Sequence, residues 1–425
     1  MDRDDLQRLS KDELIDLVLK IQRPDKTSRT SSKPPSTDRK ERREHARPGG
    51  AKPGHQGHSR RLCETPDAFE DHVPAHCPQC LAGFGAAAAR ELIGEYDEIE
   101  LPPVRPFVRR HRRFAVHCGH CGVSVAGPLP AAARKTPFGP RIHALAIYLK
   151  TRHALSYQRL QQLFLDLFGL TISQGALMNT FARTAPAFDD KKAQALAVLR
   201  KAGCVASDET GVRIEGVNAF HWVFACKSAV VHVADFSRAA EVVRQTMAGH
   251  RPDVWTSDRY SAQQRHAALH QTCLAHLARD VAYGVEASED LVPVRLKLWF
   301  DRVFAFARNL VGMAKSTLRV KRRELERQID DILNTATLCP VARELIGKIA
   351  RARDQLLVFC SFPGEVEPTN NGCERALRPA VIQRKITNGY RAMWAAEYET
   401  SVRSAVDTAR LAGAAPFATI LHTVA

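Results

Sequence analysis

Long apolar segments are missing from this sequence. No run of about 18 uninterrupted apolar residues occurs in its 425 residues, so a membrane-spanning helix is excluded. A secretory signal is missing as well, because the first residues, Met1–Asp5, are acidic and no apolar stretch ending in small residues follows them. We therefore expect a protein of the cytoplasm with no membrane partner.

Acidic residues are scarce relative to basic ones. The chain has 62 Lys and Arg against 46 Asp and Glu, which gives a formal net charge of +16. A surplus of that size favours a polyanionic partner, and nucleic acid is the first candidate. The length and the ordinary share of hydrophobic residues predict a globular protein of about two to four domains.

Apolar periodicity is missing from residues 23–61, which are rich in Ser, Pro and Gly. This segment has 12 Lys and Arg against four Asp and Glu, so it carries half of the net charge in under a tenth of the chain. We predict a disordered basic linker that binds phosphates, in preference to a merely solvated tail. Its candidate DNA-binding residues are Arg39, Lys40, Arg42, Arg43, Lys52, Arg60 and Arg61.

A disulfide framework is missing too. Of the 11 cysteines, seven stand alone and four form two Cys-x-x-Cys pairs that are 37 residues apart. Two such thiolate pairs complete a tetrahedral zinc site, so we predict one structural Zn²⁺ in a small zinc ribbon. Redox-active or unliganded thiols are the alternative, and three neighbouring histidines are close enough to replace a cysteine ligand. The predicted ligands are Cys77, Cys80, Cys118 and Cys121, and the histidines are His76, His117 and His120.

Helical periodicity occurs on both sides of the cysteine pairs. Near the N-terminus it predicts an amphipathic, leucine-zipper-like helix, which either associates with a partner or a second copy or docks on its own chain. After the cysteines it predicts helices over 142–151, 157–168 and 173–183, with a short turn at Gly169. Two helices split by such a turn are typical of a helix-turn-helix, but a plain helical hairpin explains the apolar positions equally well.

From residue 201 the apolar period changes to two, which predicts strands. Strands followed by alternating elements imply a mixed α/β layer domain that carries a helical insertion. The predicted strands are 202–206, 211–215, 220–226, 229–234, 253–256 and 272–276, and the predicted helices are 237–247, 262–269, 292–352, 373–378 and 402–411. The expected domains are the helix 1–22, the linker 23–61, the zinc module 62–130, the helical segment 137–190, the α/β domain 200–400 with its insertion at about 290–360, and the C-terminal helical element 401–425.

Two carboxylates occupy matching positions in that α/β domain. Asp208 ends a predicted strand that begins at residue 201, and Asp258 ends another that begins at 253. Alternate residues of a strand share a face, so Glu209 points away from Asp208. If the two strands are neighbours, their terminal carboxylates converge at one edge and offer the oxygen ligands that Mg²⁺ prefers. Either Asp alone is better explained as a turn residue.

A third acid, Glu374, lies at the start of a predicted helix. With Asn371 as N-cap it resembles a capping box, which is a purely structural explanation. Basic residues that suit phosphate binding surround it, and they favour catalysis instead. Three carboxylates that hold two metal ions roughly 4 Å apart would activate water and stabilise the leaving oxygen of a phosphodiester. The basic residues are Arg375, Arg378, Arg384 and Lys385.

Several blocks of the sequence form a recognisable series: 31–35, 53–58, 137–140, 172–177, Ser207–Gly211, Trp255–Tyr260, Cys273–His276 and Thr369–Pro379. These blocks resemble the transposases of the insertion-sequence-66 family. They follow one another in the family's order, so the resemblance covers nearly the full chain. Cys373 and the segment Met393–Ala396 differ from the family pattern, but neither removes a carboxylate.

The resemblance implies an RNase H-like catalytic domain with a DDE triad at Asp208, Asp258 and Glu374, and a helical insertion before the Glu. It also implies two Mg²⁺ or Mn²⁺ ions, a zinc-finger-like DNA-binding module at the paired cysteines, and hydrolysis of DNA ends followed by strand transfer. The pair Cys273 and His276 has no partner pair in the sequence, so we expect it to lie in a satisfied core.

We therefore expect a DDE transposase of a bacterial-type insertion sequence, associated with the nucleoid. Its expected partners are double-stranded DNA, as element ends and as target, a second copy of itself, and accessory proteins of the same element. Two alternatives remain open: a catalytically inactive DNA-binding relative, and a metal-dependent nuclease that cuts without strand transfer.

Overall fold

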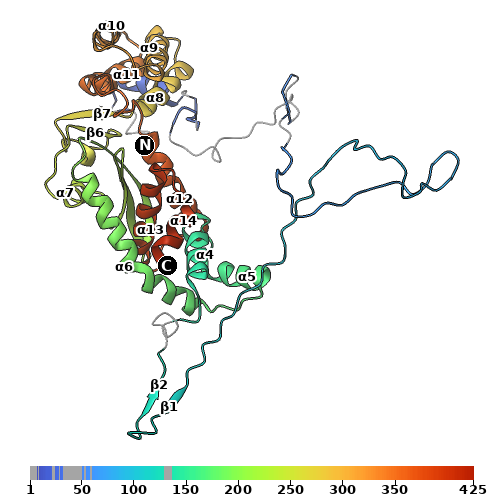
Figure 1. Ribbon diagram of the computed structural model, residues 1–425. Coiled ribbons are helices and arrows are strands. Elements are labelled where there is room, and N and C mark those ends of the chain that lie inside the picture. Colours follow the sequence, from blue (N-terminus) through green and yellow to red (C-terminus); the bar gives the residue numbers. More distant parts are fainter. Residues whose placement is uncertain are drawn as a thin grey trace. The chain divides into compact units, whose positions relative to one another are not determined.

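The computed structural model describes residues 7, 9–21, 24–27, 29–31, 50–51, 54–57, 60–128 and 136–425. The chain divides into two units: Lys40–Pro106, and Met1–Arg39 together with Phe107–Ala425. Every helix and strand that the structure bounds lies in the larger unit (Figure 1). The two cysteine pairs are divided between the units, so the structure describes each pair by itself.

Around the cysteine pairs, regular structure is sparse. Strands β1 (Ala115–His117) and β2 (Ser124–Ala126) pair antiparallel and flank the second cysteine pair. In the described part of the smaller unit, one antiparallel β-bridge joins His76 to Gly83, and the first cysteine pair lies in the loop between these two residues. Most apolar side chains of residues 60–128 are exposed, so neither segment buries a core.

The predicted N-terminal helix is present as α2 (Lys11–Ile21). It begins with a reciprocal cap, because Glu13 N donates to Ser10 Oγ (3.2 Å) and Ser10 N donates to Glu13 Oε2 (2.7 Å). The acidic side chain thus satisfies a free amide at the start of the helix.

The predicted helical segment forms α4 (Pro140–Arg152), α5 (Tyr157–Phe168) and α6 (Gln174–Leu199). Ser156 caps α5, and Gly169, with a left-handed φ of 60°, ends it, which confirms the predicted bounds. Ser173 caps α6 as predicted. However, α6 does not end near residue 183, because Phe188, Ala195 and Leu199 are buried along its second half.

The α/β domain is built on a five-stranded mixed sheet with the strand order β5-β4-β3-β6-β7. The first three strands pair antiparallel, whereas β6 and β7 run parallel to β3. This order and direction are consistent with an RNase H-like domain. The strands are β3 (Cys204–Ile214), β4 (Val217–Ala225), β5 (Val230–Asp235), β6 (Val254–Ser257) and β7 (Leu269–Thr272).

Three local predictions in this domain are wrong. The strands expected at 202–206 and 211–215 form one strand, because β4 pairs with β3 without interruption from residue 206 to residue 214. The helix expected at 262–269 is limited to the turn η2 (Ser261–Gln263), and β7 follows because it pairs with β6. The strand expected at 272–276 is instead the end of β7 and the start of a helix.

Helix α7 (Ala240–Met247) follows β5 and begins a little later than predicted. The predicted helical insertion is present between β7 and Glu374. Its helices share one apolar core around Trp299, Phe300 and Ile349, and they lie together beyond the β6–β7 edge of the sheet (Figure 1). The helices are α8 (Leu274–Ala287), α9 (Leu291–Arg308), α10 (Lys315–Leu333) and α11 (Pro340–Ala350), followed by the turns η3 (Arg353–Gln355) and η4 (Val358–Ser361).

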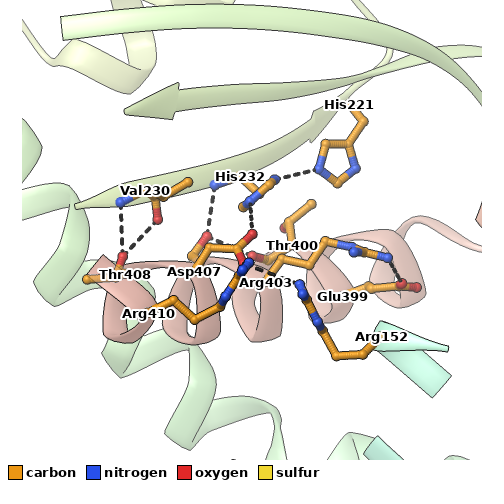
Figure 2. Close-up of polar contacts among 11 residues, drawn as sticks. Arg152, His221, Val230, His232, Glu399, Thr400, Arg403, Asp407, Thr408 and Arg410 are labelled. Carbon is orange, nitrogen blue, oxygen red and sulfur yellow. Dashed lines mark hydrogen bonds and ion pairs between the residues drawn. The ribbon is translucent and has the colours of Figure 1, made fainter. Parts of the chain in front are cut away.

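The chain closes with α12 (Asn371–Thr387), α13 (Met393–Leu411) and α14 (Pro416–Val424). Helix α13 packs against both α6 and β5, and the core beside it joins residues from α4, α5, α6, α13 and α14. Figure 2 shows the polar contacts that bind α13 to β5. The domain boundaries expected at residues 190 and 401 therefore fall within helices that share one core. The division into domains stays a prediction. No helix in the described ranges is both long and apolar enough to span a bilayer.

Candidate active site

Asp208 and Asp258 lie on neighbouring parallel strands. The pairing of β3 with β6 ends at Ala206 opposite Thr256. Each Asp lies two residues beyond that last pair, and parallel strands run in the same direction, so both carboxylates lie at the same end of the pairing. Asp258 directly follows β6 as expected. Asp208 lies within β3 instead of ending it, because the strand continues along β4.

The charges around Asp208 repel one another. Burial, together with the negative charges of Glu209, Asp258 and Glu374, raises the pKa of Asp208 to about 8. Two hydrogen bonds hold these carboxylates locally: Glu209 N donates to Asp208 Oδ1 (2.9 Å), and Tyr260 N donates to Asp258 Oδ1 (2.8 Å). The three predicted catalytic acids are thus close enough to act on one another electrostatically.

Glu374 reaches this place from the first turn of α12. The helix does not begin with the expected capping box, because its N-cap is Asn370 and not Asn371, and no side chain caps it. Asn370 instead binds two other segments: its Nδ2 donates to Ser207 O (2.7 Å), and its backbone N donates to Cys273 Sγ (3.1 Å). Sequence reasoning missed Asn370, although it lies in one of the family-like blocks.

The pair Cys273 and His276 also lies beside Glu374. Cys273 is buried, as expected of a core residue. The expectation fails for His276, whose side chain is 36% exposed and whose Nε2 lies 3.9 Å from Glu374 Oε1. Arg279, one turn further along α8, places its Nη2 3.8 Å from the same oxygen. The start of α8 therefore faces the start of α12.

Glu209 has separate partners, as the alternation along β3 predicts. Arg238 donates to Glu209 Oε1 from both Nε (2.8 Å) and Nη2 (2.6 Å), and Gln263 donates to Oε2. The guanidinium of Arg238 also lies 3.9 Å from the ring centroid of Tyr260. Sequence reasoning missed Arg238 and Gln263, since only the fold brings them to β3.

The four basic residues predicted near Glu374 have different surroundings. Arg375, Arg378 and Lys385 are exposed on α12. Arg384 is half-buried and donates from Nη1 to Thr210 Oγ1 (3.2 Å) and to Gly211 O, so a structural contact with β3 accounts for it. DNA binding by these side chains stays a prediction.

Of the basic residues predicted to bind DNA from the linker, two lie among the described residues. Arg60 and Arg61 are exposed. The remaining predicted linker residues, Arg39, Lys40, Arg42, Arg43 and Lys52, lie outside the described residues.

Each cysteine pair forms the same kind of turn. Cys77 N donates to Ala82 O (2.9 Å), and Cys118 N donates to Val123 O (2.8 Å), so the two segments have matching backbone bonds. In one turn the backbone N–H groups of Cys80 and Gln79 lower the pKa of Cys77, and in the other those of Cys121 and His120 lower the pKa of Cys118. Such turns favour thiolates, which is what a zinc ion needs.

A five-stranded mixed sheet with three acids gathered beside its central strand is typical of the DDE enzymes of RNase H-like fold. The chain belongs to the IS66 family of transposases, because the family model described as "Transposase IS66 family" matches residues 135–398. The match spans the sheet, the three acids and the helical insertion. It is a family that catalyses DNA cleavage and transfer. No curated protein sequence matches the chain.

Proposed function

We propose that this chain is a catalytically active transposase in which Asp208, Asp258 and Glu374 hold two divalent ions, Mg²⁺ or Mn²⁺. It would cut the ends of its mobile element and join the freed 3′ ends to target DNA. The observation that carries the proposal is the mutual repulsion of these acids, which contributes to a pKa of about 8 at Asp208. An acid whose pKa is raised by burial and by neighbouring carboxylates, as that of Asp208 is, is typical of functional sites.

The donor set fits hard divalent ions. Carboxylate oxygens are the ligands that Mg²⁺ takes in proteins, and positive charge between the acids would restore the ionised form of Asp208 at neutral pH. When bound, such ions supply activation of water and stabilisation of the leaving oxygen of a phosphodiester.

The chain's own residues hold the acids in place. Asn370 bonds to the backbone of Ser207, next to Asp208, so it fixes the start of α12 against β3. On the other side of β3, the bonds of Arg238 and Gln263 to Glu209 fix the segments after β5 and after β6 against the same strand. These contacts orient the three acids without taking up their charge.

DNA would approach across the start of α12. Arg375 and Arg378 are exposed there, immediately after Glu374 and one turn further along. Their guanidinium groups suit the backbone phosphates of a strand whose scissile bond lies at the acids. We assign sequence reading to the helices α5 and α6 and to the cysteine turns, and general phosphate binding to the basic linker.

The experiment is incubation of the full chain with duplexes that carry the element's ends, in Mg²⁺. Cleaved and joined products are expected from the wild type, and neither from Asp208→Asn or Asp258→Asn. The matched control is Asp235→Asn, because Asp235 ends β5 and accepts a turn bond from Ser237 N (2.6 Å) away from the acids. Cleavage without joining would favour a nuclease, and binding without cleavage an inactive relative.

The linker is tested separately, by comparing DNA binding of the full chain with that of a variant from which residues 23–61 are deleted. Deletion should weaken binding to end-specific and scrambled duplexes alike, because phosphate contacts carry little sequence information. The plot of log K against log salt should become shallower by several units, since fewer counterions are released. A selective loss on end-specific duplexes, with an unchanged slope, would assign sequence reading to the linker instead.

A further inference from the structure

One cluster of metal-binding side chain types is left over by the proposed function. Single donor atoms of Cys273, His276 and Glu374 all lie within 4.8 Å of one another. Within the described ranges it is the one group of three such side chains with donor atoms this close. Cys273 and His276 come from the start of α8 and Glu374 from the start of α12, so segments almost 100 residues apart in the sequence converge here.

The sulfur of Cys273 is surrounded by backbone donors. Asn370 N lies 3.1 Å from Sγ, and the N–H groups of Ala275 and His276 also point to it. These two donors are the second and third residues after the cysteine. The sulfurs of Cys77 and Cys118 receive N–H bonds from the same two relative positions. The Cys273-Leu-Ala-His276 turn therefore has the local donor geometry of the two predicted zinc turns.

The other two side chains present buried atoms without hydrogen bonds. His276 Nδ1 and Glu374 Oε1 are both buried and have no hydrogen-bond partner among the described residues. The contacts of Oε1 with His276 Nε2 and Arg279 Nη2, at 3.9 and 3.8 Å, are ion pairs too long for hydrogen bonds. Buried polar atoms are rarely left unpaired in folded proteins, so these two indicate a missing partner.

The donor types select the ion. A thiolate with an imidazole suits zinc and disfavours magnesium, and zinc sites with three protein ligands keep a fourth position for water or another ligand. Ligands of a tetrahedral zinc ion lie about 3.3–3.6 Å apart for bond lengths of about 2.0–2.3 Å. The side chains of His276 and Glu374 are both about one-third exposed, and the donor atoms, within 4.8 Å of one another, would have to approach by roughly 1 Å to reach that spacing.

We propose that Cys273, His276 and Glu374 form a second zinc site of this chain, distinct from the paired cysteines. The ion joins the start of α8 to the start of α12 and so closes the helical insertion at its base. A carboxylate has two oxygens, so Glu374 serves this ion with one of them and remains a ligand of the acidic centre with the other. The zinc site does not rest on the proposed function, because metal binding is measured without DNA.

The experiment is measurement of the metal content of the full chain after purification and dialysis against zinc-free buffer. Cys273→Ser and His276→Gln should each lose one zinc ion per chain relative to the wild type. The matched control is Cys360→Ser, which removes another buried thiol, from the core of the helical insertion, and should leave the zinc content unchanged. Cys118→Ser combined with Cys121→Ser should remove a different ion, so its loss should add to that of His276→Gln.

Cobalt gives a second readout. The starting variant for this readout lacks Cys118 and Cys121 and is loaded with Co²⁺ in place of zinc. It should show the absorption band of charge transfer from a thiolate to cobalt. Adding Cys273→Ser to this variant should abolish the band. His276→Gln keeps the thiol and changes a side chain that is 36% exposed, so we expect the fold to be retained and the visible bands to weaken and shift. Circular dichroism of each variant identifies any that fail to fold.

Two variants distinguish the second zinc site from the proposed catalytic centre. Asp258→Asn should lose DNA cleavage and keep the full zinc content, whereas Glu374→Gln should lose both. If zinc content and the cobalt spectrum are the same in wild type, Cys273→Ser and His276→Gln, the second zinc site does not exist. That result would not contradict the proposed catalytic role of Asp208, Asp258 and Glu374.

Discussion

Two clusters of buried charge lie on the same face of the sheet, and they are balanced in opposite ways. Asp208 of β3, Val223 of β4 and His232 of β5 are register partners, so their side chains share a face. At the β3 end three acids repel one another. At the β5 end each acid has a cationic partner (Figure 2).

The partners at the β5 end, which we call the α13 network, are close. Asp407 Oδ2 lies 3.1 Å from His232 Nε2, Asp407 Oδ1 lies 3.2 Å from Arg152 Nη1, and Glu399 Oε1 lies 2.7 Å from Arg403 Nη2. Although burial acts to raise it, the hydrogen bond to His232 and the charges around it hold the pKa of Asp407 below its usual range. Among the described residues, Asp208 and Asp258 have no comparable ion pair, and the ion pairs of Glu374 with Arg279 and His276 are longer, at 3.8 and 3.9 Å.

The largest expected effect is loss of catalysis at the unpaired acids. Asp258→Ala should reduce DNA cleavage by roughly 10³-fold or more, because bound metal ions supply several kcal/mol of transition-state stabilisation. Thermal unfolding should change little, since the substitution removes a repelling charge. Parallel cleavage assays and melting curves check both statements. Full activity in Asp258→Ala would remove this residue from the catalytic centre.

The next effect is loss of stability at the α13 network. Asp407→Ala should lower the free energy of unfolding by about 3–5 kcal/mol, because it leaves the buried His232 and the partly buried Arg152 without their acceptor. Urea denaturation monitored by tryptophan fluorescence measures the change.

The control for Asp407 is the exposed ion pair between Glu241 and Arg244, whose side chains are 50% and 61% exposed. Glu241→Ala should cost less than about 1 kcal/mol. Similar losses from Asp407→Ala and Glu241→Ala would contradict the view that the α13 network supports the fold.

A third prediction concerns the pH dependence of stability. Burial lowers the pKa of His221 well below its usual range, and burial lowers that of His232 despite its bond to Asp407. Because the pKa of each imidazole is lower in the folded chain than in the unfolded chain, unfolding takes up protons at a pH below about 6.5. Stability should therefore fall as the pH falls below that value, by up to about 1.4 kcal/mol per pH unit for each histidine.

The variant His221→Gln tests that slope. It keeps a polar group near His232 Nδ1, which lies 2.9 Å from His221 Nε2 in the wild type. Between pH 6.5 and 5 its stability should fall by about 1.4 kcal/mol per pH unit less steeply than that of the wild type. Equal slopes in urea titrations would show that His221 is protonated in the folded chain.

The sequence predicted the fold and these two clusters of charge only in part. Local signals were sufficient where the structure depends on local bonds: Ser156 and Gly169 bound α5, and Ser173 begins α6. The three acids were identifiable from their positions and from the family resemblance, and the sheet does bring them near one another. The continuity of β3 was not predictable from local pattern, because β4 imposes it through pairing.

Contacts between distant segments were the hardest to predict. Arg384 was assigned to phosphate binding from its place in a basic run, yet its guanidinium donates to β3. Nothing in the local sequence indicates that Arg403 bonds to Gln383 inside the core or that Asn370 bonds to Ser207. These roles depend on which helix packs on which strand, and the pattern of a single sequence does not show that packing.

The smallest expected effect is the stability change of Glu374→Ala in chelator-treated protein. A glutamate in the first turn of a helix gains about 0.3–1 kcal/mol from the helix dipole. Repulsion from Asp208 opposes this gain, and α12 has no side-chain cap that the substitution could remove. We expect a net loss below about 0.5 kcal/mol.

The reference for Glu374 is Ser173→Ala, which removes a real cap, since Ser173 Oγ accepts from Ala176 N at 3.1 Å. That change should cost about 1 kcal/mol. Chelation strips metal from both variants, so neither measurement includes the energy of metal binding. If Glu374→Ala cost as much as Ser173→Ala, the glutamate would support the fold as the paired acids of the α13 network do. A smaller cost together with abolished cleavage separates the two clusters by function.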